Sequence, residues 1–177
     1  MKLTPAMQAF VLHWGDMGAK WGTNRSVAQI HALLHLADRP LSADDICEAL
    51  SLARSNVSTG LKELQSFGLV QTSRKLGERK ERFTALHDPM DMVRAVVKAR
   101  RDKEFLPTLE ALEGVLTDAG DDGTPDATRA RIAETLEVMQ MFDTWYRDVS
   151  RLPKSVQVAL VRMGAGLARL LPKGRDG

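Results

Sequence analysis

The sequence has little cysteine, few aromatic residues and no long apolar run. Cys47 is the single cysteine among 177 residues, which excludes an internal disulfide framework. No uninterrupted apolar run of about 18 residues occurs, so we expect no transmembrane helix. The apolar residues near the N-terminus are interrupted by His13, Trp14, Gly15 and Asp16, where a signal peptide would need a continuous apolar stretch. These absences predict a cytoplasmic protein.

Patterns by which enzyme active sites are usually recognised are also missing. The sequence contains no arrangement typical of a Ser/His/Asp triad, no glycine-rich nucleotide loop and no plausible pair of catalytic carboxylates. We therefore expect neither enzymatic activity nor a cofactor. The hydrophobic content of 44% and the charged content of 27% are ordinary for a globular chain. The net charge of +2 is compatible with nucleic acid binding but does not establish it.

Residues 51–64 have the pattern of a helix that reads DNA. At about 100° per residue, Val57, Leu61 and Leu64 lie on one narrow apolar stripe. The opposite face is small, polar and almost free of acid; it carries Ser55, Thr59, Lys62 and Ser66. Short polar side chains allow a helix to approach base edges and phosphates closely. An ordinary amphipathic surface helix is the alternative interpretation.

The residues before and after this helix favour the DNA-reading interpretation. Ser42 followed by Asp45 is a variant of the capping box, and it predicts a short helix that ends near Leu50. A turn of about three or four residues then leads into the next helix, which is the spacing of a helix-turn-helix. Gly68 is the expected C′ residue at the end of that second helix.

A β-hairpin with a basic tip is predicted next, because residues 69–75 and 82–86 flank a turn that contains Gly77. Between positions 54 and 82, seven basic residues stand against three acidic ones, so positive charge is concentrated in this part of the chain. The helix and the hairpin together supply the candidate DNA-binding residues, which are Arg54, Ser55, Asn56, Ser58, Thr59, Lys62, Arg74, Lys75, Arg79, Lys80 and Arg82.

Two helices are predicted before the helix-turn-helix. Thr4 and Pro5 start a strongly amphipathic helix that runs to Gly22, and a second helix follows Asn24 and runs to Ala37. The second helix carries His31 and His35 at a spacing that can hold a metal ion, with His13 as a conceivable third ligand. No HExxH motif and no cysteine or carboxylate cluster accompanies them, so packing is the favoured role and no metal site is predicted. Cys47 is interpreted as a small buried residue, because its acidic neighbours disfavour a reactive thiolate.

Long helices are predicted after the hairpin as well. Asp88 and Pro89 cap the first, and Pro107 should kink or break it. Thr124 and Pro125 start another that Pro153 ends, and a last helix spans residues 154–171. These helices and residues 7–21 each carry an apolar stripe. The rest of the chain is too short to cover these stripes, so we expect the helices to pack against a second subunit. Arg162 and Arg169 leave attachment of the last helix to a membrane surface as the less favoured alternative.

The predicted fold is mainly α with a small β-hairpin wing. It is a winged helix-turn-helix with N- and C-terminal dimerisation helices. Residues 1–24 form the N-terminal helix for dimerisation or effector binding, residues 25–87 the DNA-binding domain, and residues 88–177 the C-terminal helical dimerisation region.

These motifs, in this order, resemble the GbsR-type branch of the MarR superfamily of winged helix-turn-helix transcriptional regulators. The resemblance runs from about Phe10 to Leu112. It is carried by Asn24-Arg25, Arg54-Ser55-Asn56-Val57-Ser58, Gly68-Leu69-Val70, Gly77 with Arg79-Lys80, and Asp88-Pro89. One residue departs from the pattern: Ala53 stands where such proteins usually have serine. Alanine cannot cap a helix, so the recognition helix should either start elsewhere or be capped by Ser51.

The resemblance implies a homodimeric repressor that binds a double-stranded DNA operator and is released by a small-molecule effector. Members of this branch include repressors that respond to choline-like compounds, for which an aromatic cage is the natural receptor. The candidate effector-binding residues are Trp14, Trp21, Trp145 and Tyr146, with Phe142 near them in sequence. Packing is the alternative role for these aromatic residues. A winged-helix module that binds protein without specific DNA binding is the alternative function.

Overall fold

The computed structural model describes residues 1–74 and 80–170, with side chains described as far as Gly164. The chain divides into two compact units, Met1–Arg101 and Asp102–Gly177. The wing turn with Gly77, and with it Lys75 and Arg79, lies outside the described residues.

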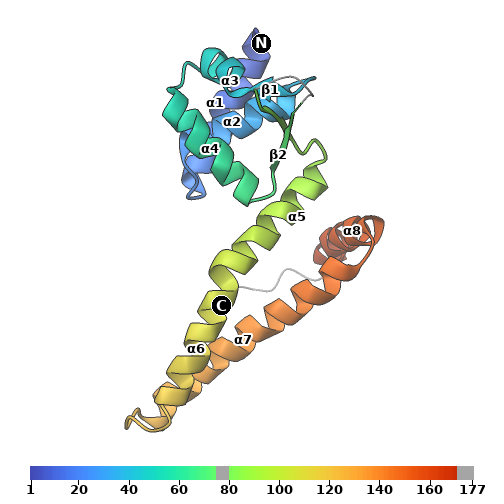
Figure 1. Ribbon diagram of the computed structural model, residues 1–177. Coiled ribbons are helices and arrows are strands. Elements are labelled where there is room, and N and C mark those ends of the chain that lie inside the picture. Colours follow the sequence, from blue (N-terminus) through green and yellow to red (C-terminus); the bar gives the residue numbers. More distant parts are fainter. Residues whose placement is uncertain (75–79, 171–177) are drawn as a thin grey trace. The chain divides into compact units, whose positions relative to one another are not determined.

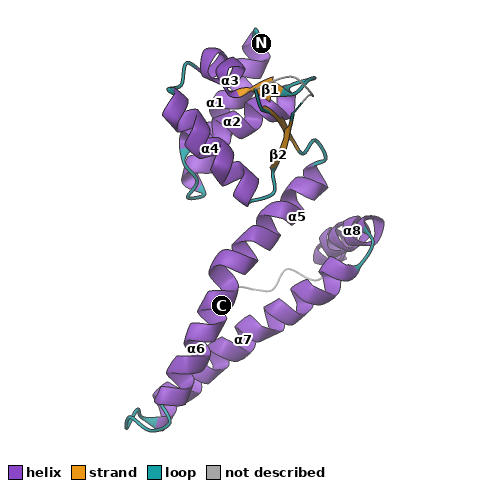
Figure 2. Cartoon of the chain, in the orientation of Figure 1, coloured by secondary structure: helices purple, strands orange, loops and turns teal. Residues whose placement is uncertain are grey.

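The first unit contains the helix-turn-helix and a small sheet (Figures 1 and 2). In chain order its elements are α1 (Pro5–Lys20), α2 (Arg25–Leu36), β1 (Leu41–Ser42), α3 (Ala43–Leu50), α4 (Arg54–Ser66), β2 (Val70–Ser73), β3 (Arg82–Ala85) and α5 (Pro89–Arg100). The three strands are antiparallel in the order β1-β3-β2, with Phe83 opposite Thr72 on one side and Leu41 on the other. The predicted hairpin is confirmed as β2 and β3, whereas the two-residue strand β1 was not predicted.

Helix starts in this unit follow the predicted caps. The Thr4 and Asn24 side chains accept hydrogen bonds from the backbone N–H groups of Met7 (3.3 Å) and Ser26 (2.8 Å). At the start of α3, the Asp45 N–H donates to Ser42 Oγ (3.2 Å) and the Ser42 N–H donates to the Asp45 carboxylate (2.8 Å). This pair of bonds is the predicted capping box, and it fixes where α3 begins.

The core of this unit lies around α2, in contact with α1, α3, α4 and β3. Its largest fully buried side chains are Ile30, Leu33, Leu34, Leu41, Ile46 and Val57. Gly60 allows α4 to approach α2 closely, because a Cβ at that position would lie 2.8 Å from Cδ1 of Ile30. The inner side of α4 is closely packed against α2, and its outer side remains exposed to solvent.

His31 is a core residue rather than an exposed ligand. It is 5% exposed, its ring lies 6.2 Å from that of Trp14 and 6.3 Å from that of His35, and its Nε2 has no hydrogen-bond partner among the described residues. Burial, and secondarily the nearby His35, lower the pKa of His31 from 6.5 to about 4. Cys47 is half-buried against the core, as expected for a small apolar residue.

The described part of the second unit consists of helices and the turns that connect them. A π-helical turn, Arg101–Phe105, precedes α6 (Leu106–Asp118), and α7 (Asp126–Arg151) and α8 (Lys154–Leu170) follow. Pro107 lies in the first turn of α6, so the predicted interruption takes the form of a π-turn just before the proline. Helices α6 and α7 lie side by side and contact each other (Figure 1).

The predicted start of α7 is wrong by one residue. Thr124 was expected to cap the helix, but Pro125 is the N-cap and makes no side-chain cap bond. The Thr124 N–H and hydroxyl instead donate to Oδ1 of Asp122, at 2.8 Å and 2.5 Å. These bonds tie Thr124 to the preceding loop, and the first turn of α7 begins after Pro125 instead.

A buried glutamine closes the other end of α7. Nε2 of Gln157, in α8, donates to the carbonyl oxygens of Val149 (3.1 Å), Ser150 (3.3 Å) and Leu152 (2.8 Å). The Val149 oxygen also accepts from the Leu152 N–H (3.1 Å), and Gln157 adds a side-chain donor for the carbonyl groups at this helix end, which fixes the turn between α7 and α8.

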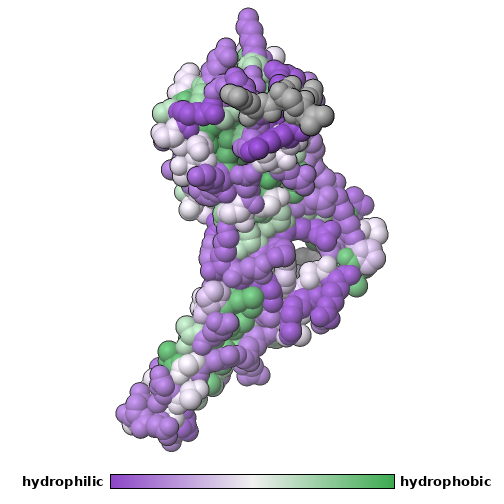
Figure 3. All heavy atoms as spheres, in the orientation of Figure 1, coloured by the Kyte–Doolittle hydropathy of each residue, from purple (hydrophilic) through white to green (hydrophobic). Residues whose placement is uncertain are grey.

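Large apolar side chains remain exposed on α7 and α8. Trp145 is 62% exposed and Val161 is 67% exposed; Val138, Met141, Phe142, Val156, Leu160 and Met163 are exposed as well. Figure 3 shows hydrophobic patches that interrupt the polar surface of this helical unit. Among the described residues, no helix is long and apolar enough to cross a membrane.

Candidate nucleic-acid interface

Helix α4 begins at Arg54 without a side-chain cap. Ala53 is the N-cap residue and accepts no bond through its side chain. Ser51, the predicted alternative cap, has a left-handed backbone (φ 53°) and ends α3, where its N–H donates to the Cys47 carbonyl oxygen. Neither predicted alternative holds: α4 starts at Arg54, directly after Ala53, and Ser51 does not cap it. Ser51 instead adopts the left-handed backbone conformation of the tight turn between α3 and α4.

The two faces of α4 are as predicted. Val57, Leu61 and Leu64 are buried at 0%, 3% and 4% exposure. The polar residues of the predicted reading face are all exposed; they are Arg54, Ser55, Asn56, Ser58, Thr59 and Lys62. The Leu69 N–H donates to the Leu64 carbonyl oxygen (3.0 Å), and Gly68 has a positive φ of 69°, so the helix ends at the predicted glycine.

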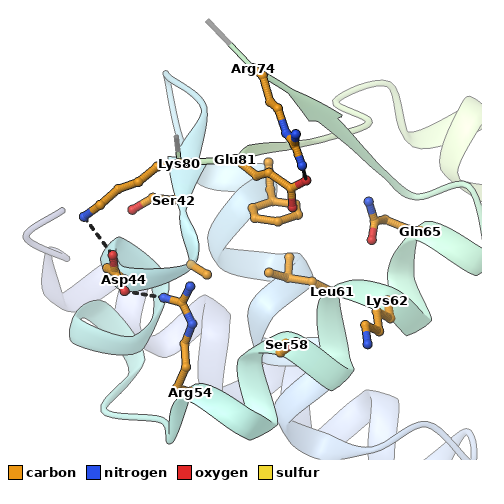
Figure 4. Close-up of a pocket in the computed structure, with 12 residues that line it drawn as sticks. Ser42, Asp44, Arg54, Ser58, Leu61, Lys62, Gln65, Arg74, Lys80 and Glu81 are labelled. Carbon is orange, nitrogen blue, oxygen red and sulfur yellow. Dashed lines mark hydrogen bonds and ion pairs between the residues drawn. The ribbon is translucent and has the colours of Figure 1, made fainter. Parts of the chain in front are cut away.

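A cavity of about 460 Å³ lies between α4, the start of α3 and the hairpin (Figure 4). Arg54, Ser58, Lys62 and Gln65 line it from α4, and side chains from α3 and the hairpin close it. Gln65 Nε2 donates to the hydroxyl of Thr72, which joins α4 directly to β2. The hairpin is thus held beside the exposed face of α4.

The basic side chains around this cavity are mostly paired with carboxylates. Asp44 contacts both Arg54 and Lys80, with its Oδ2 at 2.9 Å from Lys80 Nζ. The hydrogen bond from Lys80 and the charge of Arg54 lower the pKa of Asp44 below 3.8. Glu81 Oε1 accepts from Nε of Arg74 at 3.1 Å. Figure 4 shows Arg54 and Lys80 converging on Asp44 from opposite sides.

Asp44, Gln65 and Glu81 contribute to this surface but were not among the predicted site residues. From the sequence, Asp44 was considered only as one of the acidic neighbours of Cys47. Its partner Lys80 lies 36 residues away along the chain, and no local pattern reports a contact of that separation.

Among the described residues Lys62 has no carboxylate partner. Arg82, in β3, is half-buried.

The predicted effector residues divide between the two units. Trp14 stacks on Phe10 with ring centroids 5.3 Å apart, and Trp21, at the end of α1, is 69% exposed. In α7, Trp145 is exposed and Tyr146 is half-buried. That these residues bind an effector stays a prediction. Within the described part of the chain, no three His, Cys, Asp or Glu side chains are grouped to hold a metal ion.

A short helix, a tight turn, a helix with an exposed polar face and a β-hairpin beside it define a winged helix-turn-helix protein. Residues 21–79, which contain the two helices and strand β2 of the hairpin, match the model of the MarR family. The chain is 25% identical over 149 residues to the HTH-type transcriptional repressor GbsR of Bacillus subtilis (strain 168), covering 77% of this chain and 78% of that protein.

A solved structure described as a transcriptional regulator has the same fold. It superposes with a TM-score of 0.69 at 19% identity and covers 81% of this chain and 95% of that one. The winged helix-turn-helix part of the chain is therefore similar to the MarR family, and the chain over most of its length is similar to a GbsR repressor.

Proposed function

We propose that the chain is a repressor that binds a specific double-stranded DNA operator as a homodimer. The observation that carries this proposal is the exposed face of α4, whose short polar side chains lie beside a cavity lined by Arg54, Lys62, Arg74 and Lys80. In a two-fold dimer, two such helices enter successive major grooves about 34 Å apart. The relative named as a repressor supports negative control of transcription.

Base contacts and phosphate contacts come from different parts of this surface. Ser55, Asn56 and Thr59 are short and exposed, and with Lys62 they reach base edges from the major groove. Arg54, Arg74 and Lys80 surround the cavity and contact phosphates, which position the protein on DNA without reading sequence. Ser58, Arg82 and the two wing residues Lys75 and Arg79 complete the proposed contact surface.

A fluorescence anisotropy titration tests sequence-specific binding. The probes are a duplex from the region upstream of the protein's own gene and a random-sequence duplex. Thr59→Ala and Lys62→Ala should each weaken the specific duplex by about 1–3 kcal/mol and the random duplex by less. Arg74→Ala combined with Lys80→Ala should weaken both duplexes by similar factors. Equal effects of all these changes on both duplexes would show that α4 does not read sequence.

The homodimer forms through α1, α7 and α8 in this proposal. The exposed apolar side chains of α7 and α8, such as Trp145 and Val161, form the kind of surface that a subunit interface covers. Light scattering should report twice 19.6 kDa. Deleting residues 154–177 should weaken dimerisation and DNA binding together, since two linked half-site contacts bind far better than one. A stable monomer at micromolar concentration contradicts the proposal.

A small cationic effector releases the repressor in this proposal, and aromatic residues bind it. Trp21 and Trp145 are exposed, and Trp14 and Tyr146 are half-buried, so all four can report a nearby ligand through intrinsic fluorescence. Choline or betaine should change that fluorescence and lower DNA affinity. If neither compound has an effect while zinc or peroxide abolishes DNA binding, the sensor lies elsewhere.

A further inference from the structure

One carboxylate at the edge of the proposed DNA surface holds two cations from two separate elements. Arg54, at the start of α4, donates from Nη1 to Oδ1 of Asp44, and Lys80, beside β3, donates from Nζ to Oδ2 at 2.9 Å. All three side chains are more than half exposed. A guanidinium and an ammonium group therefore converge on one two-oxygen anion in contact with solvent (Figure 4).

The same two cations are suited to a DNA phosphate. A phosphodiester presents two charged oxygens, and Arg and Lys are the side chains that most often contact them. Exposed ion pairs contribute little to stability, so an incoming phosphate can replace the Asp44 carboxylate at little cost in protein stability. The displaced carboxylate then remains close to a polyanion without its partners.

From this geometry we propose that the Asp44 carboxylate occupies the site at which a backbone phosphate of DNA binds. This proposal rests on the proposed DNA binding. The carboxylate occupies Arg54 and Lys80 in the free protein, and DNA must displace it. Because the contact involves phosphate and not base edges, Asp44 lowers the affinity for every duplex by a similar factor. Asp44 is thus a positioning residue that sets overall DNA affinity rather than sequence preference.

The fold does not depend on Asp44 to hold these elements together. The start of α3 is fixed by the capping box of Ser42 and Asp45, which leaves the Asp44 side chain free of that role. The joint between α3 and α4 is held by buried side chains, including Ile46 and Val57. Removing the Asp44 charge should therefore leave the unit folded.

The test compares Asp44→Asn with Glu48→Gln in the full-length protein. Both changes remove one negative charge from an exposed position of α3, but among the described residues no cation pairs with Glu48. Asp44→Asn should tighten binding to a random-sequence duplex and to the upstream duplex by the same factor, roughly tenfold, and Glu48→Gln by much less. The slope of log affinity against log salt should steepen by about 0.9 per subunit, since no displaced anion remains beside the DNA.

A second comparison shows whether Asp44 acts through its two partners. In a protein that already carries Arg54→Ala and Lys80→Ala, Asp44→Asn should change affinity no more than Glu48→Gln does. A full tenfold gain in that background would show a general charge effect and overturn the proposal. Circular dichroism confirms that each variant is folded.

The remaining outcomes are equally decisive. Weaker binding by Asp44→Asn would mean that the carboxylate holds the cations in place for DNA, which overturns the proposal. A gain on the upstream duplex alone would mean that Arg54 or Lys80 reads bases, which overturns it as well. If the wild-type protein binds DNA and Asp44→Asn is unchanged, only this inference fails. If the wild-type protein and every variant bind no duplex, the proposed function itself fails.

Discussion

Replacing His31 should remove a large part of the acid sensitivity of folding. In the folded protein, burial lowers the pKa of His31 to about 4, whereas its value in the unfolded chain is 6.5. The imidazole of His31 is therefore neutral in the folded protein at neutral pH. As pH falls below 6.5 the unfolded chain binds a proton that the folded chain does not, so stability decreases down to about pH 4 and is not lost further below it.

The two pKa values set the size of the effect. Between about pH 7.5 and about pH 5, this single group should reduce the free energy of unfolding by about 2 kcal/mol. The carboxylates with shifted values do not interfere. Interactions with their neighbours lower the pKa of Asp44, Asp45 and Asp122 below 3.8, so the stability that they contribute is lost only at more acidic pH. The chosen pH window therefore isolates His31 from them.

Urea denaturation of wild type and His31→Phe at the two pH values provides the measurement. Phenylalanine keeps an aromatic ring against Trp14 and cannot be protonated, so the variant should lose about 2 kcal/mol less than wild type over the window. His13→Gln, which removes an exposed histidine from α1, is the control and should behave as wild type. The reasoning is refuted if His31→Phe and wild type lose the same stability.

Three further changes test packing and capping, each by urea denaturation at neutral pH. Gly18→Ala should destabilise the protein by about 1–3 kcal/mol, because its Cβ would lie 2.5 Å from that of Ala28 and push α1 from α2. Gly114→Ala, at an exposed helical position with nothing within 4 Å, should instead stabilise it by about 0.5–1 kcal/mol. Ser42→Ala should cost about 1 kcal/mol, because the Asp45 N–H loses its partner in the capping box. A neutral Gly18→Ala, a costly Gly114→Ala or a neutral Ser42→Ala would each contradict the corresponding geometry.

Features that depend on residues close in sequence could be predicted. The Ser42 capping box joins positions three apart, and the buried stripe of α4 repeats every three or four residues, so the chain order alone contains both patterns. Gly68 at the end of α4 is a third case, since the positive φ needed there favours glycine. The fold class followed from these local signals and their spacing.

Features that depend on distant residues could not be predicted. Strand β1 is two residues long and exists only because it pairs with β3, some forty residues further on. Gln157 caps α7 from the next helix, a role that no sequence pattern of α7 indicates. The Thr124 error has the opposite origin: a standard cap signal was present, but Thr124 bonds to Asp122 in the preceding loop and α7 begins one residue later.

The same limit applies to the charge of the proposed DNA surface. Counting from position 54 to position 82 gave a positive excess but left out Asp44, which belongs to the preceding helix and neutralises cations at both ends of that segment. Net charge governs long-range attraction to DNA. The energy of each contact depends also on the carboxylate partner that the cation must give up in order to bind phosphate. Arg54 and Lys80 must leave Asp44, and Arg74 must leave Glu81, so these three cations contribute less to binding than their number suggests. Lys62 has no such carboxylate among the described residues, so its contact with DNA is made without breaking an ion pair.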